Sequence, residues 1–351
     1  MSNTTASKEP ADSTSLVSRV SPMRRLAQMV VTVGVLPLLI ALMVIVFGIL
    51  EPRFLNGSNL VNILRQATFL SIVAMGQMLA LISAGFDLSV GAVVALTSVI
   101  TASVMAGMVV DPGGPVAFAV IAGCGAGLMV GLVVGLLNGL GVAVLKVSPF
   151  IVTLGTSSAI GGVALLLTGG APIVGLPDMF VESLGSGRIF KIPTVIYITA
   201  AIIIAMYFVM NWSRFGRYIY AIGGNEVASR LSGIRVGYYL TSVYVVSGLL
   251  ASIAGLLLTA RVSAGEPNLG GPFAMQSITA AVLGGTSLRG GEGKLAGVIL
   301  GALFIAMLSN GMNLIRVSSF WQMILLGGLL IFAVVVDRLR SRLTYAIQKE
   351  S

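Results

Sequence analysis

The sequence lacks histidine altogether and contains one cysteine, Cys124. Without histidine, three classes of site are excluded: Ser-His-Asp triads, histidine-ligated metal sites and histidine proton relays. Cys124 lies in an apolar run and has no second cysteine to pair with, so no disulfide forms within the chain. We therefore expect no catalytic residues, no cofactor and no metal ligands.

Charged side chains are also scarce. They make up 9% of the 351 residues, whereas soluble domains carry about 25%. Apolar residues account for 56%, a composition that predicts an integral membrane protein surrounded by lipid. The net charge of +9 does not indicate a nucleic-acid partner, because the basic residues lie in short loops between apolar runs, where they orient membrane proteins.

Ten apolar runs are present, and a helix needs roughly 20 residues to cross a bilayer. The sequence thus predicts an all-α polytopic membrane protein with a transmembrane domain over 26–337. The expected spans lie near 27–49, 66–84, 88–110, 116–137, 150–168, 194–210, 238–260, 274–288, 295–313 and 320–337. The eighth is short and flanked by glycines.

The two ends of the chain are polar. Residues 1–25 are rich in serine and threonine and are expected to be disordered, and 338–351 form a basic tail. The apolar run after residue 25 is too long for the core of a signal peptide, so we interpret it as the first span. Ten spans place both ends on one side, and most lysines and arginines fall on that side if it is cytoplasmic.

Glycine is abundant, with 44 residues. Gly123, Gly127, Gly131 and Gly135 recur at the small-xxx-small spacing that lets transmembrane helices approach closely. We expect this face to pack within the subunit. A seam between two copies of the chain is the alternative.

The stretch 211–236 is the longest polar interruption in the apolar chain, and on the charge pattern it is cytoplasmic. Within it, NEVASRLSG reads as a complete short helix. We expect Asn225 to cap its start, Glu226 and Arg230 to pair at i,i+4, and Gly233 to end it in a left-handed conformation. Val227 and Leu231 share one face. Such an amphipathic helix suits docking of a soluble partner.

An internal repeat links the two halves of the chain. SAG at 83–85 returns at 263–265, LLNG and LSNG end at Gly139 and Gly311, and VSPF at 147–150 returns as VSSF at 317–320. The offsets are all about 170 to 180 residues and keep the same order. The halves, about 66–168 and 238–337, lie five spans apart, so the repeat is inverted. Inverted repeats are typical of transporters.

Few polar residues lie within the spans. Asp87 is interpreted either as a pathway or gate residue or as an N-cap of the third span, and the two readings are compatible. The amides are Gln77, Asn138, Gln276, Asn310 and Asn313. They either line a pathway or bond helices together. Since no charged group lies at mid-membrane, the set favours a neutral polyhydroxylated cargo over an ion.

The chain has no ATP-binding motif of its own. GGEGK at 290–294 resembles the end of a P-loop, but Leu288 stands where that motif requires glycine. Leu295 stands where serine or threonine is required. Any ATP-driven activity therefore needs a separate subunit.

The sequence resembles the permease subunit of ribose-type carbohydrate ABC importers from about residue 50 to 337. The resemblance lies in SAGFDLSVGA at 83–92, LLNGLGVAVLKVSPFIVTLGT at 136–156, GRYIYAIGGNEVASRLSGI at 216–234, VSGLLASIAGLLLTARV at 246–262 and AAVLGGTSLRGGEGKLAGVILGAL at 280–303. It implies a ten-span permease of the bacterial inner membrane that pairs with a second permease copy, either identical or related. It also implies cytoplasmic ATP-binding subunits and a periplasmic sugar-binding protein as partners.

The resemblance further implies that 216–234 holds a coupling helix around Asn225–Ser232. That helix would dock in a groove of the ATPase, whose closure on ATP would switch access across the membrane. The coupling residues expected from it are Asn225, Glu226, Val227, Arg230, Leu231 and Gly233.

The resemblance implies a monosaccharide, a pentose or a hexose, as cargo. Autoinducer-2 and branched-chain amino acids are alternatives, because related permeases share the general plan. Two hypotheses of other classes remain: an ion-coupled secondary transporter, motivated by the inverted repeat, and a non-transporting scaffold or receptor.

Overall fold

The computed structural model describes residues 35–108 and 116–350 of the chain. Within them the only sheet is a short antiparallel ribbon of β1 (Arg188–Ile189) and β2 (Ile192–Pro193). The all-α architecture expected from the composition is therefore confirmed. The tail 1–25, and the start of the first span before residue 35, lie outside the described residues.

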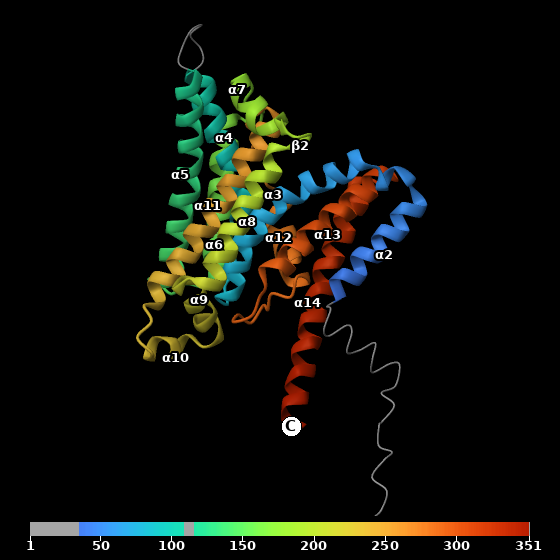
Figure 1. Cartoon of the computed structure of the whole chain (residues 1–351). Coiled ribbons are helices and arrows are strands. Elements are labelled where there is room, and N and C mark those ends of the chain that lie inside the picture. Colours follow the sequence, from blue (N-terminus) through green and yellow to red (C-terminus); the bar gives the residue numbers. More distant parts are fainter. Residues whose placement is uncertain (1–34, 109–115, 351) are drawn as a thin grey trace, which may run out of the picture.

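Long apolar helices build the molecule, running up and down along one axis (Figure 1). They are α2 (Val35–Leu50), α3 (Gly57–Ile82), α4 (Val90–Met108), α5 (Val116–Ala143), α6 (Pro149–Thr168), α8 (Thr194–Trp212), α11 (Val236–Val262), α12 (Phe273–Leu283), α13 (Leu295–Leu314) and α14 (Ser319–Glu350). Short elements connect them: η1 (Pro52–Leu55), α7 (Asp178–Phe180), η2 (Val181–Ser186), α9 (Arg214–Gly224) and α10 (Glu226–Leu231). Among the described residues, eight helices are long and apolar enough to cross a membrane.

The eighth predicted span, 274–288, is wrong as a full crossing. Its helix α12 has 11 residues, which at about 1.5 Å per residue is about half of the roughly 30 Å hydrocarbon thickness. The preceding segment 263–272 supplies the missing depth as non-helical backbone: the amide of Glu266 donates to Ser98 Oγ at 3.0 Å, and Gly270 packs on Gly91. Such backbone is tolerated at membrane depth only inside protein or beside water.

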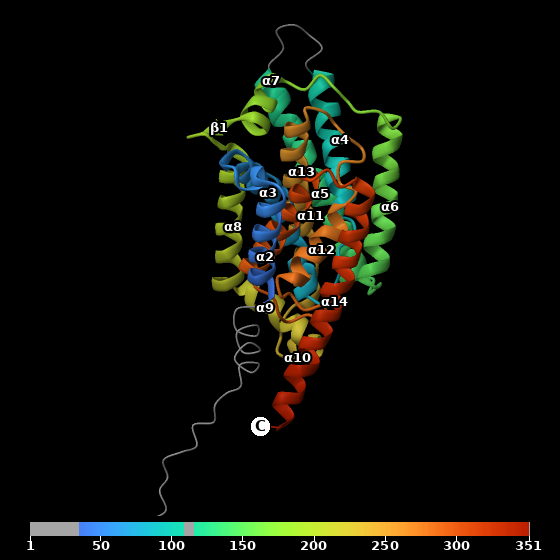
Figure 2. The same ribbon diagram turned by 90° about the vertical axis from the view of Figure 1, so that its right-hand side faces the viewer.

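α3 and α11 form the centre of the bundle. Their apolar windows are 83% and 78% buried, whereas those of α6 and α14 are 11% and 6% buried. Figure 2 shows α6 and α8 at opposite edges, with α3, α11 and α12 between them. The outer helices therefore present apolar side chains to the surroundings, as contact with lipid requires.

α5 packs on α11 through its glycine face. A side chain at Gly131 would collide with Gly248 and Ser252, and one at Gly135 would lie 2.5 Å from the carbonyl oxygen of Tyr244. Gly127 is equally tight against Thr101 and Leu256. The prediction that these glycines pack within the subunit is confirmed.

The two ends of the bundle differ in what they hold. α9, α10 and the C-terminal end of α14 lie at one end, and α7 lies at the other (Figures 1 and 2). α14 continues through Glu350, so residues 338–350 of the expected tail are helical. We call the first of these ends the α10 end.

Backbone conformations recur between the proposed repeat halves. Lys146 and Arg316, which directly precede VSPF and VSSF, have φ of 54° and 59°. Ala84 and Ser263, both in the SAG segments, have φ of 61° and 56°. The loop holding Lys146 lies at the α10 end and the loop holding Arg316 at the opposite end (Figure 1), as an inverted repeat requires.

Candidate functional site

Asn225 separates two helices at the α10 end. Its backbone amide donates to the carbonyl oxygen of Ala221 at 3.0 Å, which closes α9. Its side-chain oxygen accepts from the amide of Ala228 at 2.9 Å, which caps α10. The predicted N-cap is therefore confirmed, and a single residue sets the angle between the two helices.

α10 presents an apolar pair and a charged pair to the outside. Val227 is 69% exposed and Leu231 is 84% exposed. Glu226 and Arg230 form the predicted i,i+4 ion pair at 2.6 Å, and Gly233 ends the helix with φ of 82°. An exposed pair like this contributes little to stability. The exposed ion pair and the exposed apolar side chains are therefore better suited to binding a partner than to stabilising the fold.

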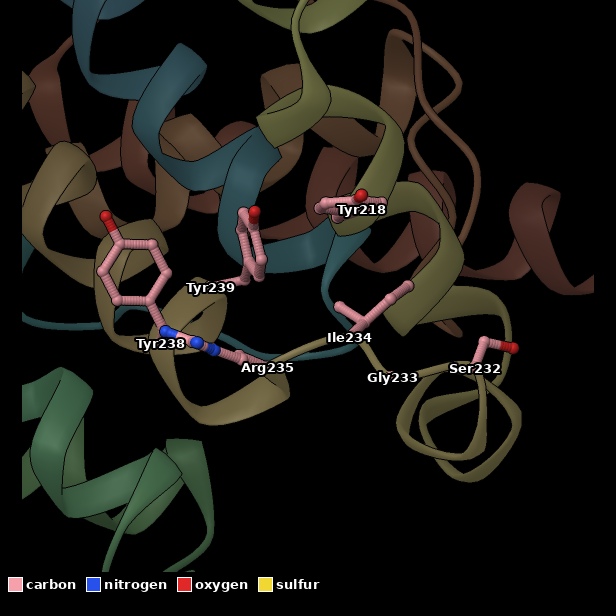
Figure 3. Close-up of a pocket in the computed structure, with 7 residues that line it drawn as sticks. All are labelled: Tyr218, Ser232, Gly233, Ile234, Arg235, Tyr238 and Tyr239. Carbon is pink, nitrogen blue, oxygen red and sulfur yellow. The ribbon is translucent and has the colours of Figure 1, made fainter.

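A cavity of about 470 Å³ lies between α9 and the start of α11. It is lined by Tyr218, Ser232, Gly233, Ile234, Arg235, Tyr238 and Tyr239. Tyr239 stands between the other two tyrosines (Figure 3), with ring centroids 5.0 Å from Tyr218 and 5.4 Å from Tyr238. The sequence analysis missed this cavity; the adjacent tyrosines after Arg235 were the available signal.

Asp87 is buried, with 1% of its surface exposed. Its Oδ1 accepts hydrogen bonds from the Ser89 amide at 3.0 Å and from Ser89 Oγ at 2.6 Å. Its Oδ2 accepts from Ser247 Oγ of α11 at 2.7 Å. The reading of Asp87 as the N-cap of the third span is wrong, because α4 begins at Val90, and Ser89, whose carbonyl oxygen accepts from Val93, holds the cap position. Asp87 instead fixes Ser89 at the start of α4 and ties that turn to α11.

Asn138 of α5 extends this cluster. Its Nδ2 donates a hydrogen bond to Ser89 Oγ at 2.8 Å. Because Ser89 Oγ in turn donates to Asp87, Asp87 and Asn138 belong to one hydrogen-bond network. Asn138 Oδ1 is buried and has no hydrogen-bond partner among the described residues. A buried acceptor without a partner is costly, so this oxygen has capacity for a water molecule or a ligand.

The other predicted amides lie elsewhere. Asn310 exchanges two hydrogen bonds with Asn59, at 2.9 and 3.0 Å, and Asn313 Oδ1 accepts from Gln322 at 2.7 Å. Gln77 is fully buried on α3, with neither amide atom bonded within the described chain, and Gln276 is half-buried on α12. Asn310 and Asn313 therefore bond to partners outside the Asp87 network, and Gln77 makes no hydrogen bond to it within the described residues.

Sequence reasoning did not find the partners of these residues. Ser89, Ser247 and Asn59 complete the networks, yet serine and asparagine in an apolar span carry no distinguishing pattern. Only the fold brings Ser247 beside Asp87, 160 positions away. Within residues 35–108 and 116–350, no group of three acidic or cysteine side chains could hold a metal ion.

Comparison with known proteins gives a consistent picture. The family described as branched-chain amino acid transport system / permease component matches residues 59–334. The chain is 40% identical over 307 residues to the ribose import permease protein of Escherichia coli, covering 85% of this chain and 92% of that protein. It is 39% identical over 301 residues to the ribose import permease protein of Bacillus subtilis, covering 86% and 91%.

A further relative is the D-allose transport system permease protein of Escherichia coli. It is 36% identical over 306 residues, covering 87% of this chain and 91% of that protein. No solved structure matches the chain.

Proposed function

This chain belongs to the family of branched-chain amino acid transport system permease components, and we propose that it forms the translocation pathway of an ATP-driven monosaccharide importer. It is a multi-pass membrane protein of the bacterial inner membrane. The observation that carries the proposal is the likeness to the ribose import permeases, at 40% and 39% identity over most of both chains. The allose permease extends the likeness to a hexose transporter.

We propose that ATP is hydrolysed by a separate cytoplasmic subunit. GGEGK at 290–294 lacks the residues of a P-loop, so the chain needs an outside source of energy. α10 is the proposed contact, because Val227 and Leu231 are exposed outside the spans and Arg230 forms an exposed ion pair on the same helix. The other residues of this coupling helix are Asn225, Glu226 and Gly233.

The translocation pathway is proposed to pass near the interface of the repeat halves. Asp87 and Asn138 of the first half meet Ser247 of the second in one buried network. The half-length α12 and the non-helical segment 263–272 match the discontinuous helices of transporters built from inverted repeats. Gln77, Gln276, Asn310 and Asn313 remain proposed pathway residues of the same kind.

The remaining partners follow from the same proposal. We place the α10 end and both termini in the cytoplasm, on the distribution of basic residues. A periplasmic sugar-binding protein would deliver cargo to the opposite end. A second permease copy, identical or related, would complete the membrane part of the importer.

Branched-chain amino acids are the second candidate cargo, favoured by the description of the family itself. Such a cargo brings an amino and a carboxylate group into the pathway. The buried network offers one carboxylate, Asp87, whose oxygens already accept three hydrogen bonds. The surroundings of Asp87 therefore suit uncharged hydroxyl groups better than a zwitterion.

The test is import by reconstituted proteoliposomes containing the permease, with or without its ATP-binding subunit. Labelled ribose, allose, galactose and leucine are offered together with the binding protein. We expect ATP-dependent uptake of one monosaccharide and none without the ATP-binding subunit. Sugar uptake by the permease alone under an ion gradient would establish a secondary transporter instead, and uptake of leucine alone would correct the cargo.

A further inference from the structure

α9 connects α10 to loops from both halves of the chain. The hydroxyl of Tyr220 in α9 donates a hydrogen bond to the carbonyl oxygen of Gly293 at 2.7 Å, across 73 positions of sequence. Burial raises the pKa of the Tyr220 hydroxyl, so it keeps its proton and remains a donor at physiological pH. Gly293 lies in the α12–α13 loop, two residues before α13 begins.

A second contact lies one turn further along α9. Gly223 is so close to the carbonyl oxygen of Ile82 that any side chain there would collide with it. The same carbonyl oxygen accepts a hydrogen bond from the amide of Gly291 at 2.8 Å. Gly290 and Gly291, with φ of 88° and 74°, bring the α12–α13 loop against Gly223 and Gly224. Three segments of backbone therefore meet without side chains between them.

Both contacts lead to elements of the proposed pathway. Ile82 is the last residue of α3, and five positions later Asp87 bonds to Ser89 and Ser247. Gly293 leads into α13. On its other side, α9 is separated from α10 by Asn225 alone, which caps one helix and closes the other.

We propose that the contacts of Tyr220 with Gly293 and of Gly223 with Ile82 form a joint that passes movements of α10 to both loops at once. This rests on the proposed function, in which an ATP-binding subunit moves α10. Close backbone contacts and a partly buried hydrogen bond resist separation, so α9 and the two loops move together. Tyr220 is a positioning residue, because it touches neither the nucleotide nor the cargo.

The space beside the joint fits this role. A cavity of about 380 Å³ lies next to the Tyr220–Gly293 hydrogen bond, lined by Tyr220, Gly284, Gly285, Glu292, Gly293 and Lys294. Glycine forms much of this lining, so the α12–α13 loop has both backbone freedom and room to shift when α9 moves.

Tyr220→Phe tests the joint, because it removes one hydroxyl and keeps the ring. The variant is assembled with the ATP-binding subunit and the binding protein in proteoliposomes. ATP hydrolysis is measured beside import of whichever labelled sugar, ribose, allose or galactose, the wild type takes up. We expect hydrolysis within twofold of wild type and import per ATP lowered about fivefold to tenfold, the effect of losing one hydrogen bond. Tyr207→Phe, in the neighbouring helix α8, keeps its ring contact with Phe208 and should match wild type.

A pair of glycine substitutions in α9 gives a second, independent test of the joint. Gly223→Ala forces α9 away from Ile82, whereas Gly224→Ala places its methyl group where no atom lies within 4 Å. We expect the first variant to uncouple hydrolysis from import at least as strongly as Tyr220→Phe, and the second to stay near wild type.

Wild-type import per ATP in Tyr220→Phe would overturn the joint. If hydrolysis and import each fell by the same factor, the hydrogen bond would be assigned to assembly. The proposed function fails on a different result, namely import by the wild-type permease without its ATP-binding subunit. The two failures are therefore distinguishable.

Discussion

At the scale of single residues, Asp87 is the most informative side chain. Its carboxylate is almost fully buried, yet both oxygens accept hydrogen bonds, one from Ser89 in the turn before α4 and the other from Ser247 of α11. A buried carboxylate is tolerable when its hydrogen-bonding capacity is satisfied in this way. Asp87 is therefore a structural centre of the bundle as well as a proposed pathway residue.

Replacing Asp87 separates these two roles. Asp87→Ala leaves three donors without an acceptor, and we expect it to lower the free energy of unfolding in detergent by about 3 kcal/mol. Asp87→Asn keeps an acceptor for Ser89 and should cost about 1 kcal/mol. Thermal unfolding of the purified permease measures both.

The exposed Asp178 provides the control, because Asp178→Asn should leave unfolding unchanged. Equal stability of the alanine and asparagine variants at position 87 would contradict the bonding network. Loss of import in a stable Asp87→Asn variant would show that the charge itself serves the pathway.

At the scale of elements, close helix contacts depend on small residues placed on one face. α5 has glycine at every fourth position where it meets α4 and α11, and its backbone lies against Gly248 and Tyr244. Each glycine in a helix interior costs about 1 kcal/mol relative to alanine. The close packing of α5 against its neighbours offsets this loss of helix propensity. The contact surface, rather than helix propensity, explains the glycine content of α5.

Gly131→Ala and Gly125→Ala form a matched pair in α5. The first methyl group would collide with Gly248 and Ser252, while the second has no atom within 4 Å. We expect Gly131→Ala to destabilise the subunit by about 2 kcal/mol, and Gly125→Ala to be neutral or slightly stabilising. Thermal unfolding in detergent tests this, and the opposite order would contradict the packing.

α10 is the element that we propose binds the ATP-binding subunit. Leu231→Asp puts a charge on its apolar face, and exchanging charges through Glu226→Arg with Arg230→Glu keeps the internal pair but reverses what a partner meets. We expect either change to weaken binding of the ATP-binding subunit at least tenfold while the permease stays folded, as co-purification would show.

Ser242→Ala in α11 is the control for these variants, since its hydroxyl bonds back to the carbonyl oxygen of Tyr238 in its own helix. Unchanged binding by both the Leu231→Asp and the charge-exchanged permease would remove α10 from the coupling role.

At the scale of the whole molecule, the two ends of the bundle must face different compartments. α10 lies at one end of the bundle and α7 at the other, with the long helices between them (Figures 1 and 2). Because Cys124 is the only cysteine, its replacement by alanine leaves a background free of thiols.

Single cysteines in that background report the orientation. We expect Met179→Cys in α7 to react with a membrane-impermeant thiol reagent in cells whose outer membrane is opened, and Leu231→Cys in α10 to react only in inside-out vesicles. Both residues are exposed, so accessibility to the reagent depends on the side of the membrane alone. The reverse pattern would place α10 outside and exclude contact with a cytoplasmic ATPase.

Hydrophobicity, charge and short-range sequence patterns predicted much of this fold, because a bilayer allows few structures. Long apolar runs located the helices, and the cap of α10, its ion pair and its terminal glycine were all readable from neighbouring residues. The glycine spacing in α5 correctly indicated packing within the subunit. These features are local, so the sequence by itself determined them.

The tertiary structure alone decided which distant residues meet. α12 is half a span because segment 263–272 finds partners on α4, which no hydropathy pattern records. The network of Asp87 with Ser247 and the bond between Tyr220 and Gly293 join positions 160 and 73 residues apart. Hydrogen bonds and backbone contacts of this kind depend on the packing of several helices at once, and that packing is a property of the folded bundle.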